Sequence, residues 1–235
     1  MEEEFLKALE KNDITRAEDI LEDMKEKMPR TRFLYLEGLL HEKLGDLEEA
    51  LKKFDMALVL HLSDHTLWMA KARTLLELES LDMAKRAAER ACRLKNEDPD
   101  AHLLLSEILY RMKEYPNAEK EIDSSLNIGK KSAPALTLKG ILVSINKQDY
   151  RLALTYFDSA IDTDGSYGRA WTNRGIALKE IGDRDGAVFS FQKGLLINPG
   201  DKNARKMLVK MGHKSFVRST KENGSMPEED EWNET

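Results

Sequence analysis

Residues 168–201 read GRAWTNRGIALKEIGDRDGAVFSFQKGLLINPGD, and this stretch decides the fold because it holds two helical patterns in succession. Trp171, Gly175 and Leu178 lie at i, i+4 and i+7, which places them on one face of a first helix. Gly182 and the aspartate after it interrupt that pattern. The first half therefore predicts an amphipathic helix that ends in a glycine turn.

The second half of the stretch carries a helical face of its own. Ala187, Phe191, Gly194 and Leu195 follow one another at i, i+4, i+7 and i+8, and Pro199 closes the unit. Two helices pack closely only where their side chains are short, so we expect the crossing at Ala187 and at the glycine of the first helix. The phenylalanine four residues after the alanine then fills the space above that contact.

The same alanine motif recurs along most of the chain. An alanine is paired with a residue four positions later, usually a bulky apolar one. The pairs are Ala17/Leu21, Ala50/Phe54, Ala84/Ala88, Ala118/Ile122, Ala153/Phe157 and Ala187/Phe191. Successive alanines are separated by 33, 34, 34, 35 and 34 residues. A constant period of this length, with helical spacing inside each unit, is typical of stacked helix pairs and predicts an all-α chain.

The pattern of residues 168–201, Trp-x2-Arg-Gly-x2-Leu followed by Ala-x3-Phe and a closing proline, resembles the tetratricopeptide repeat. Arg174 and Leu178 stand where that repeat usually has leucine and tyrosine. Earlier units match in part, through Leu34, Gly38, Ala50, Phe54 and Ala57, through Trp68, Ala72, Ala84 and Ala91, through Ala118, and through Gly140, Ala153, Phe157 and Ala160. The resemblance covers roughly residues 1–201. It implies a right-handed superhelical solenoid of antiparallel helix pairs.

The repeat register sets the expected domain organisation. It gives units of about residues 1–30, 31–64, 65–98, 99–132, 133–167 and 168–201. A last amphipathic pattern, in which Ala204 and Leu208 are four residues apart, predicts a capping helix over 202–213 that covers the apolar face of the final repeat. We therefore expect one solenoid over 1–213. The apolar periodicity stops near Lys214, so residues 214–235 are expected to form a disordered acidic tail.

Polar residues before the second helices predict how those helices begin. Asp46, with Glu49 three residues later, resembles a capping box in which aspartate is the cap. Asp13, Ser80 and Asp149 occupy comparable positions.

Composition restricts the class of protein. The 235 residues include 37 basic and 43 acidic side chains, a net charge of −6, and this acidic balance disfavours nucleic-acid binding. No apolar run reaches the roughly 18 residues of a membrane span. The start, Met1 followed by three glutamates, lacks the pattern of a signal peptide. A single cysteine, Cys92, excludes an internal disulfide framework. We expect a cytoplasmic protein.

No group of residues predicts catalysis, a cofactor or a metal. Gly182-x3-Gly186 has neither a preceding strand nor the Gly-Lys-Ser/Thr of a phosphate loop. His61 and His65 with Asp64 have metal-ligand spacing, but they fall in a turn between repeats without a further histidine or cysteine nearby. Cys92 is interpreted as a small core residue rather than a nucleophile. We expect no enzyme activity.

The candidate site is a groove. The resemblance implies that the first helices of the pairs line a concave side that binds extended peptides or partner helices. Mapping those positions onto this chain gives Arg32, Tyr35, Leu39, Met69, Arg73, Leu103, Glu107, Tyr110, Thr137, Ile141, Arg169, Thr172, Asn173 and Ile176. Tyrosine, methionine and aliphatic residues with isolated arginines have the composition of a protein-binding patch. The alternative for Leu103 and Ile141 is a place in the core.

The family's best-defined ligand site clamps the C-terminal carboxylate of heat-shock chaperones. Asn173 and Arg169 match that clamp at single positions, but Thr137 and Ile141 stand where lysine and asparagine are needed. The clamp is therefore expected to be absent.

Three functions differ in class. The favoured one is a non-enzymatic scaffold or adaptor that binds a peptide or helix of another protein in the groove. The alternatives are a nucleic-acid-binding helical repeat, whose affinity would fall steeply with salt, and a regulatory sensor of a small ligand. The acidic tail, with Trp232 among carboxylates, leaves two interpretations. It occupies a groove that contains Arg32, Arg73 and Arg169, either its own or that of a neighbouring molecule, or it has a solubilising role only.

Overall fold

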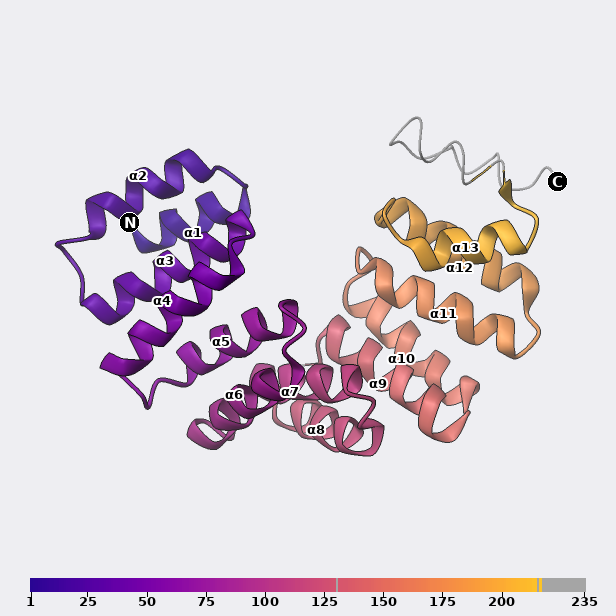
Figure 1. The fold of residues 1–235 in the computed structure, drawn as a ribbon. Coiled ribbons are helices and arrows are strands. Elements are labelled where there is room, and N and C mark those ends of the chain that lie inside the picture. Colours follow the sequence, from indigo (N-terminus) through magenta and orange to yellow (C-terminus); the bar gives the residue numbers. More distant parts are fainter. Residues whose placement is uncertain (130, 215, 217–235) are drawn as a thin grey trace. The chain divides into compact units, whose positions relative to one another are not determined.

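The computed structural model describes residues 1–129, 131–214 and 216, and in these residues the chain is helical throughout and contains no strand. The predicted tail, 214–235, lies outside the described residues except for Lys214 and Phe216. These described residues form thirteen helices, whose arrangement can be followed in Figure 1. They are α1 (Glu2–Glu10), α2 (Ile14–Met24), α3 (Arg30–Leu44), α4 (Leu47–Leu60), α5 (His65–Glu77), α6 (Leu81–Leu94), α7 (Pro99–Arg111), α8 (Tyr115–Ile128), α9 (Ala133–Lys147), α10 (Tyr150–Thr163), α11 (Gly168–Glu180), α12 (Arg184–Ile197) and α13 (Lys202–Lys210).

The helices form consecutive pairs, as the repeat predicted, and the all-α fold class is confirmed. The chain divides into two compact units. Unit 1 comprises α1–α8, within residues 1–128, and unit 2 comprises α9–α13, from residue 129 onward. No helix among the described residues is both long and apolar enough to cross a membrane.

Each pair turns through one residue in the left-handed conformation, which lets the second helix fold back on the first. Glycine occupies that position at Gly45 (φ 83°) and Gly182 (φ 90°). In the other four pairs the residue is Asn12, Glu79, Lys113 or Gln148. The next residue donates its backbone N–H to the carbonyl five residues earlier in most of these turns, for example at 2.9 Å in the pair α3–α4. This is the Schellman arrangement that satisfies carbonyls at the end of a helix.

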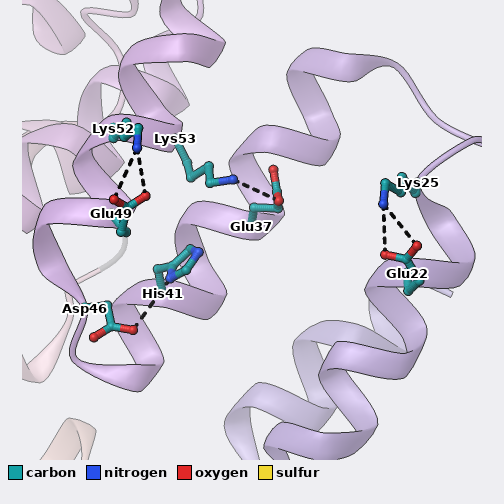
Figure 2. Close-up of polar contacts among 8 residues, drawn as sticks. All are labelled: Glu22, Lys25, Glu37, His41, Asp46, Glu49, Lys52 and Lys53. Atoms are coloured by element: carbon teal, nitrogen blue, oxygen red, sulfur yellow. Dashed lines mark hydrogen bonds and ion pairs between the residues drawn. The ribbon is translucent and has the colours of Figure 1, made fainter.

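The expected helix caps are present in some pairs and absent in others. Asp13 and Asp149 accept hydrogen bonds from backbone N–H groups of the first turn, at 3.3 and 3.0 Å. Ser80 makes no side-chain cap bond, and neither does Asp46, so the predicted capping box is wrong. The carboxylate of Asp46 instead lies 3.8 Å from Nδ1 of His41 (Figure 2).

A polar contact also links the two helices of the pair α3–α4. Nζ of Lys53 on α4 lies 3.0 Å from the carboxylate of Glu37 on α3, and both side chains are mostly buried (Figure 2). The other ion pairs in that view, Lys52–Glu49 and Lys25–Glu22, are local contacts on exposed helix surfaces. Exposed pairs of this kind contribute little stability, about 0–1 kcal/mol.

The predicted register of the core is confirmed. All six motif alanines, Ala17, Ala50, Ala84, Ala118, Ala153 and Ala187, have no exposed surface. The partner residues four positions later are also buried. A Cβ atom on Gly175 would lie 2.8 Å from the ring of Phe191, and one on Gly140 would lie 2.5 Å from the ring of Phe157. These two glycines are therefore required by the close approach of a phenylalanine ring.

The last helix covers the end of unit 2, as expected for a capping helix. Ala204 and Leu208 of α13 are fully buried in the same apolar cluster as Phe191 and Leu195 of α12. The carboxylate of Asp201 caps α13 by accepting the backbone N–H of residue 204 at 3.0 Å. The apolar face that the final pair would otherwise expose is buried in this way.

Candidate functional site

The first helices of unit 1, α3, α5 and α7, approach one another along one side of that unit, which we call the first-helix face. Most predicted groove residues of this unit are partly exposed there, and Arg73 is exposed. The residues are Arg32, Tyr35 and Leu39 on α3, Met69 and Arg73 on α5, and Leu103, Glu107 and Tyr110 on α7. All eight therefore offer side-chain surface to a ligand.

Arg32 is already engaged by a carboxylate of the same chain. Its Nε donates a hydrogen bond to Oε1 of Glu2, on α1, at 3.1 Å, and a second guanidinium nitrogen contacts the same oxygen. This hydrogen bond raises the pKa of Arg32 and lowers the pKa of Glu2. The guanidinium also lies over the ring of Tyr35, 4.6 Å from its centroid. Arg32 therefore holds a carboxylate of the same chain while its guanidinium lies against a tyrosine ring.

A hollow of about 240 Å³ opens beside this arginine. Its lining combines a cation, a carboxylate, a histidine and apolar surface. The lining residues are Pro29, Thr31, Arg32, Tyr35, His61, Asp64 and Leu67. Asp64 is the cap of α5 and accepts hydrogen bonds from the backbone N–H and the hydroxyl of Thr66, at 2.9 and 2.7 Å. The hollow therefore lies where α3 meets the beginning of α5.

Two other ionisable side chains of α3, Tyr35 and Glu42, have shifted pKa values. Burial raises the pKa of Tyr35, although the charges of Arg32 and Arg73 act in the opposite direction. Burial also raises the pKa of Glu42, and the hydroxyl of Thr74 partly offsets this by donating to its carboxylate at 2.6 Å. Sequence reasoning missed Glu2 and Glu42. Nothing in the local pattern marks either residue, because each acquires its role from a partner about 30 residues away.

Unit 2 presents a smaller set of predicted residues. Thr137, Ile141 and Thr172 are buried, with 1%, 7% and 4% of their surface exposed, so Ile141 lies in the core position that the alternative offered. The hydroxyl of Thr172 donates to the carboxylate of Asp201 at 2.7 Å, which ties α11 to the start of α13.

The predicted residues of unit 2 that reach solvent are Arg169, Asn173 and Ile176. The side-chain amide of Asn173 donates to the backbone carbonyl of Arg169 at 2.8 Å. These three residues lie on one side of α11, at spacings of three and four residues.

His65, at the start of α5, contacts the beginning of the next first helix in unit 1. His65 lies 3.1 Å from the carboxylate of Asp98, the cap of α7, and Asp64 caps α5. Among the described residues no group of three or more histidine, cysteine and acidic side chains could hold a metal ion. Cys92 is buried, and this burial raises the pKa of its thiol to about 12. A thiol that stays protonated is a poor nucleophile, which supports the interpretation of Cys92 as a core residue.

Sequence comparison finds repeat proteins. Models of the tetratricopeptide repeat match residues 3–64, 69–133 and 168–201. An uncharacterized protein of Methanocaldococcus jannaschii, MJ0572, is 39% identical over 59 residues, which are 25% of this chain and 67% of that protein.

Solved structures show the same fold at low sequence identity. One chain of a structure described as the APC/C hetero-tetramer Cut9-Hcn1 has a TM-score of 0.82 at 18% identity. The match covers 93% of this chain but only 46% of the matched chain, so this protein spans less than half of that chain. PilW, a type IV pilus biogenesis factor, has a TM-score of 0.70 at 15% identity over 84% of this chain and 95% of its own. YrrB, described as having an unusual peptide-binding site, has a TM-score of 0.57 at 21% identity, over 79% of this chain and 95% of its own.

Proposed function

The chain belongs to the tetratricopeptide repeat family, and from this premise we propose that it is a non-enzymatic cytoplasmic scaffold or adaptor. Its first-helix face in unit 1 binds a peptide or helix of a partner protein. Proteins of this family generally mediate protein–protein interaction, and YrrB, which has the same fold, is described as having a peptide-binding site.

The observation that carries the proposal is the contact between Arg32 and Glu2. A carboxylate is held by an arginine whose guanidinium lies over a tyrosine ring, beside a hollow of about 240 Å³. Arg73, which is exposed on the next first helix, offers a second cation to the same face. An acidic residue next to an apolar one, in a partner peptide, matches this combination of arginines, ring and hollow.

Most of the energy of such a contact comes from the charged hydrogen bonds and the ring surface. A hydrogen bond to a charged group contributes about 1.5–3 kcal/mol, and truncation of one central contact commonly weakens binding at least about tenfold. Leu39, Met69, Leu103 and Tyr110 supply the apolar surface around the arginines. In unit 2, we propose Arg169, Asn173 and Ile176 as the residues with the same role.

Selection of peptides from a random displayed library against the full chain tests this proposal. We expect the selected peptides to be rich in aspartate or glutamate beside an apolar residue. Arg73→Gln should weaken their binding about tenfold, measured by calorimetry. Arg86→Gln is the matched control, because Arg86 is equally exposed but lies on the second helix α6. Selected peptides that bind both variants as tightly as the unchanged chain would contradict the proposal.

A variant of the apolar surface provides a second test. Changing Tyr35, Met69 and Tyr110 together to alanine should weaken binding and leave the helical circular dichroism nearly unchanged, because these side chains are only partly buried. Unchanged affinity at unchanged fold stability would place the binding site elsewhere on the molecule.

The acidic tail is a candidate for the same face, since its carboxylates and Trp232 have the chemistry that we propose for the partner. Removal of residues 222–235 should raise the affinity for selected peptides at low salt if the tail competes with them. An unchanged affinity at every salt concentration would leave the tail a solubilising role only.

A further inference from the structure

A ring nitrogen closes the turn between consecutive pairs at three equivalent positions. Nε1 of Trp68 donates to the carbonyl of Leu62 at 2.8 Å, and Nε1 of Trp171 donates to the carbonyl of Gly165 at 2.9 Å. His102 has the same place in its repeat, with a ring nitrogen 3.0 Å from the carbonyl oxygen six residues earlier. The indole of Trp171 is therefore held in one orientation before any ligand arrives.

In unit 2 a second aromatic ring stands beside this indole. The ring centroid of Phe189, on α12, lies 6.0 Å from that of Trp171 with the planes at 73°, an edge-to-face arrangement. Phe189 is 44% exposed. The equivalent residue of the pair α5–α6 is Arg86, so that pair has no second aromatic ring beside its tryptophan. Two aromatic rings at a surface, one of them fixed by a hydrogen bond, form a rigid recognition element.

The two rings line a hollow of about 260 Å³ together with Ile161, Arg174 and two carboxylates, Asp158 and Asp162. Arg174 already pairs with Asp158, Nε to Oδ1 at 2.7 Å, and a second guanidinium nitrogen donates to the hydroxyl of Ser190. Asp162 is exposed, and among the described residues it makes no ion pair. One negative charge at the hollow is therefore left without a counter-ion.

The backbone adds to the attraction for a cation at this place. Asp162 lies in the last turn of α10, which ends at Thr163, and the carbonyls at a helix C-terminus favour positive charge. The ring of Phe189 also attracts a cation within the chain, since Nζ of Lys193 lies 5.5 Å from its centroid. The carboxylate of Asp162, the end of α10 and the ring of Phe189 therefore each attract positive charge at the hollow, where Lys193 already lies against that ring.

We propose that this hollow, formed by α10, α11 and α12, binds the lysine or arginine side chain of a basic peptide from a partner protein. Its volume lies below the roughly 300–1,000 Å³ of typical small-molecule sites, so it accommodates one long side chain rather than a whole ligand. The alkyl part of the side chain packs on Trp171 and Phe189, and the charged end reaches Asp162.

This site is separate from the face assigned to the proposed function. Trp171 and Arg174 lie on the opposite side of α11 from Arg169, Asn173 and Ile176, because a helix turns by 3.6 residues. The chain therefore carries a binding site for a basic group in unit 2, in addition to a carboxylate-binding face in unit 1.

Nuclear magnetic resonance of the indole N–H group of Trp171 in the full chain tests this site. The signal is assigned with the single variants Trp68→Phe and Trp232→Phe. The probe is an acetylated and amidated peptide Gly-Lys-Gly-Lys-Gly, and the matched peptide carries norleucine in place of each lysine. We expect the lysine peptide to shift the Trp171 signal saturably, with an affinity that falls as salt rises. The norleucine peptide should leave the signal in place.

Three variants test the roles of the residues. Asp162→Asn should weaken lysine-peptide binding about fivefold, because one exposed ion pair is lost. Phe189→Leu should weaken it about tenfold, because a ring face is lost. Asp185→Asn is the control for charge, since Asp185 is exposed in the same unit but does not line the hollow, and its effect should stay within about twofold. Thermal melting followed by circular dichroism verifies that each variant is folded.

Several results would overturn the site. The first is a Trp171 signal that does not move at about 10 mM lysine peptide, a concentration high enough to detect the weak affinity of a single side chain. The second is an equal shift with the norleucine peptide. The third is unchanged binding in both Asp162→Asn and Phe189→Leu. Arg73→Gln, which tests the proposed function, should leave lysine-peptide binding unchanged. The failure of one proposal is therefore distinguishable from the failure of the other.

Discussion

The helix pairs α11–α12 and α5–α6 solve the same packing problem with different residues. Gly175 faces the ring of Phe191 in the first pair, and Ala72 and Ala88 occupy the equivalent positions in the second. All of these positions are buried, and Phe191, Ala72 and Ala88 have no exposed surface. The comparison shows that a phenylalanine on the second helix excludes any side chain opposite it, whereas a small residue there permits one.

The other pairs extend the comparison. Phenylalanine is opposite glycine again at Gly38/Phe54 and Gly140/Phe157. In the pair α7–α8 the positions hold Ser106 and Ile122, and in α1–α2 both positions hold large residues, Phe5 and Leu21. In all three pairs with phenylalanine on the second helix, the first helix has glycine opposite the ring, as close packing in a protein interior requires.

Removal of the ring should give the largest effect on stability. Phe191→Ala is expected to lower the free energy of unfolding by about 3–5 kcal/mol, because a fully buried ring leaves a cavity. Urea unfolding followed by circular dichroism measures the change. Gln192→Ala, at a partly exposed neighbouring position, should change stability by no more than about 0.5 kcal/mol. Equal midpoints for the Phe191 variant and the unchanged chain would contradict the repeat register.

Substitution of Gly175 by alanine should change stability in a direction that depends on whether the Phe191 ring is present. Gly175→Ala alone is expected to cost about 1–3 kcal/mol, since the new Cβ would lie 2.8 Å from a ring that cannot move away. In the Phe191→Ala background the same change recreates the alanine pair of α5–α6 and should stabilise by up to about 1 kcal/mol, the difference in helix propensity. A double-mutant cycle of unfolding free energies measures this coupling. Additive effects would show that the two residues do not interact.

Substitution of Ser106, in the helix pair α7–α8, should give the smallest effect on stability. Oγ of Ser106 is buried and donates to the carbonyl of Ala118 at 2.8 Å. Ser106→Ala keeps the Cβ and removes only this hydrogen bond, so a loss of about 0.5–1.5 kcal/mol is expected. Ser106→Gly should cost about 1 kcal/mol more through its low helix propensity. If glycine proved more stable than alanine, position 106 would be under the same steric limit as Gly175. Thermal melts of the three proteins decide this.

The fold could be predicted in detail because its determinants are local and repeated. Helical spacing inside each unit and an alanine interval of 33–35 residues identify which faces are buried, and all six alanines have no exposed surface. Much of the turn chemistry is local as well, as Asp13 and Asp149 show. Asp46 has the same sequence context, yet its carboxylate lies near His41 instead of capping α4. Side-chain rotamers respond to neighbours that a pattern does not contain.

The candidate site could be predicted only in outline. The repeat register placed Arg32, Tyr35 and Arg73 on a partly exposed face of first helices, but the carboxylate on Arg32 comes from Glu2, a different helix. Thr172 occupies a register position that predicted binding, and the structure commits its hydroxyl to Asp201.

The amino-acid sequence by itself determined the helix pairs, their register and their small crossing residues, because backbone geometry repeats every 3.6 residues and the unit repeats about every 34. Tertiary structure alone decided which polar side chains remain available to a ligand. The charge of Asp162 stays open beside two aromatic rings, while the hydroxyl of Thr172 is held by Asp201. Availability depends on distances between helices that are far apart in the sequence, and no local pattern encodes those distances.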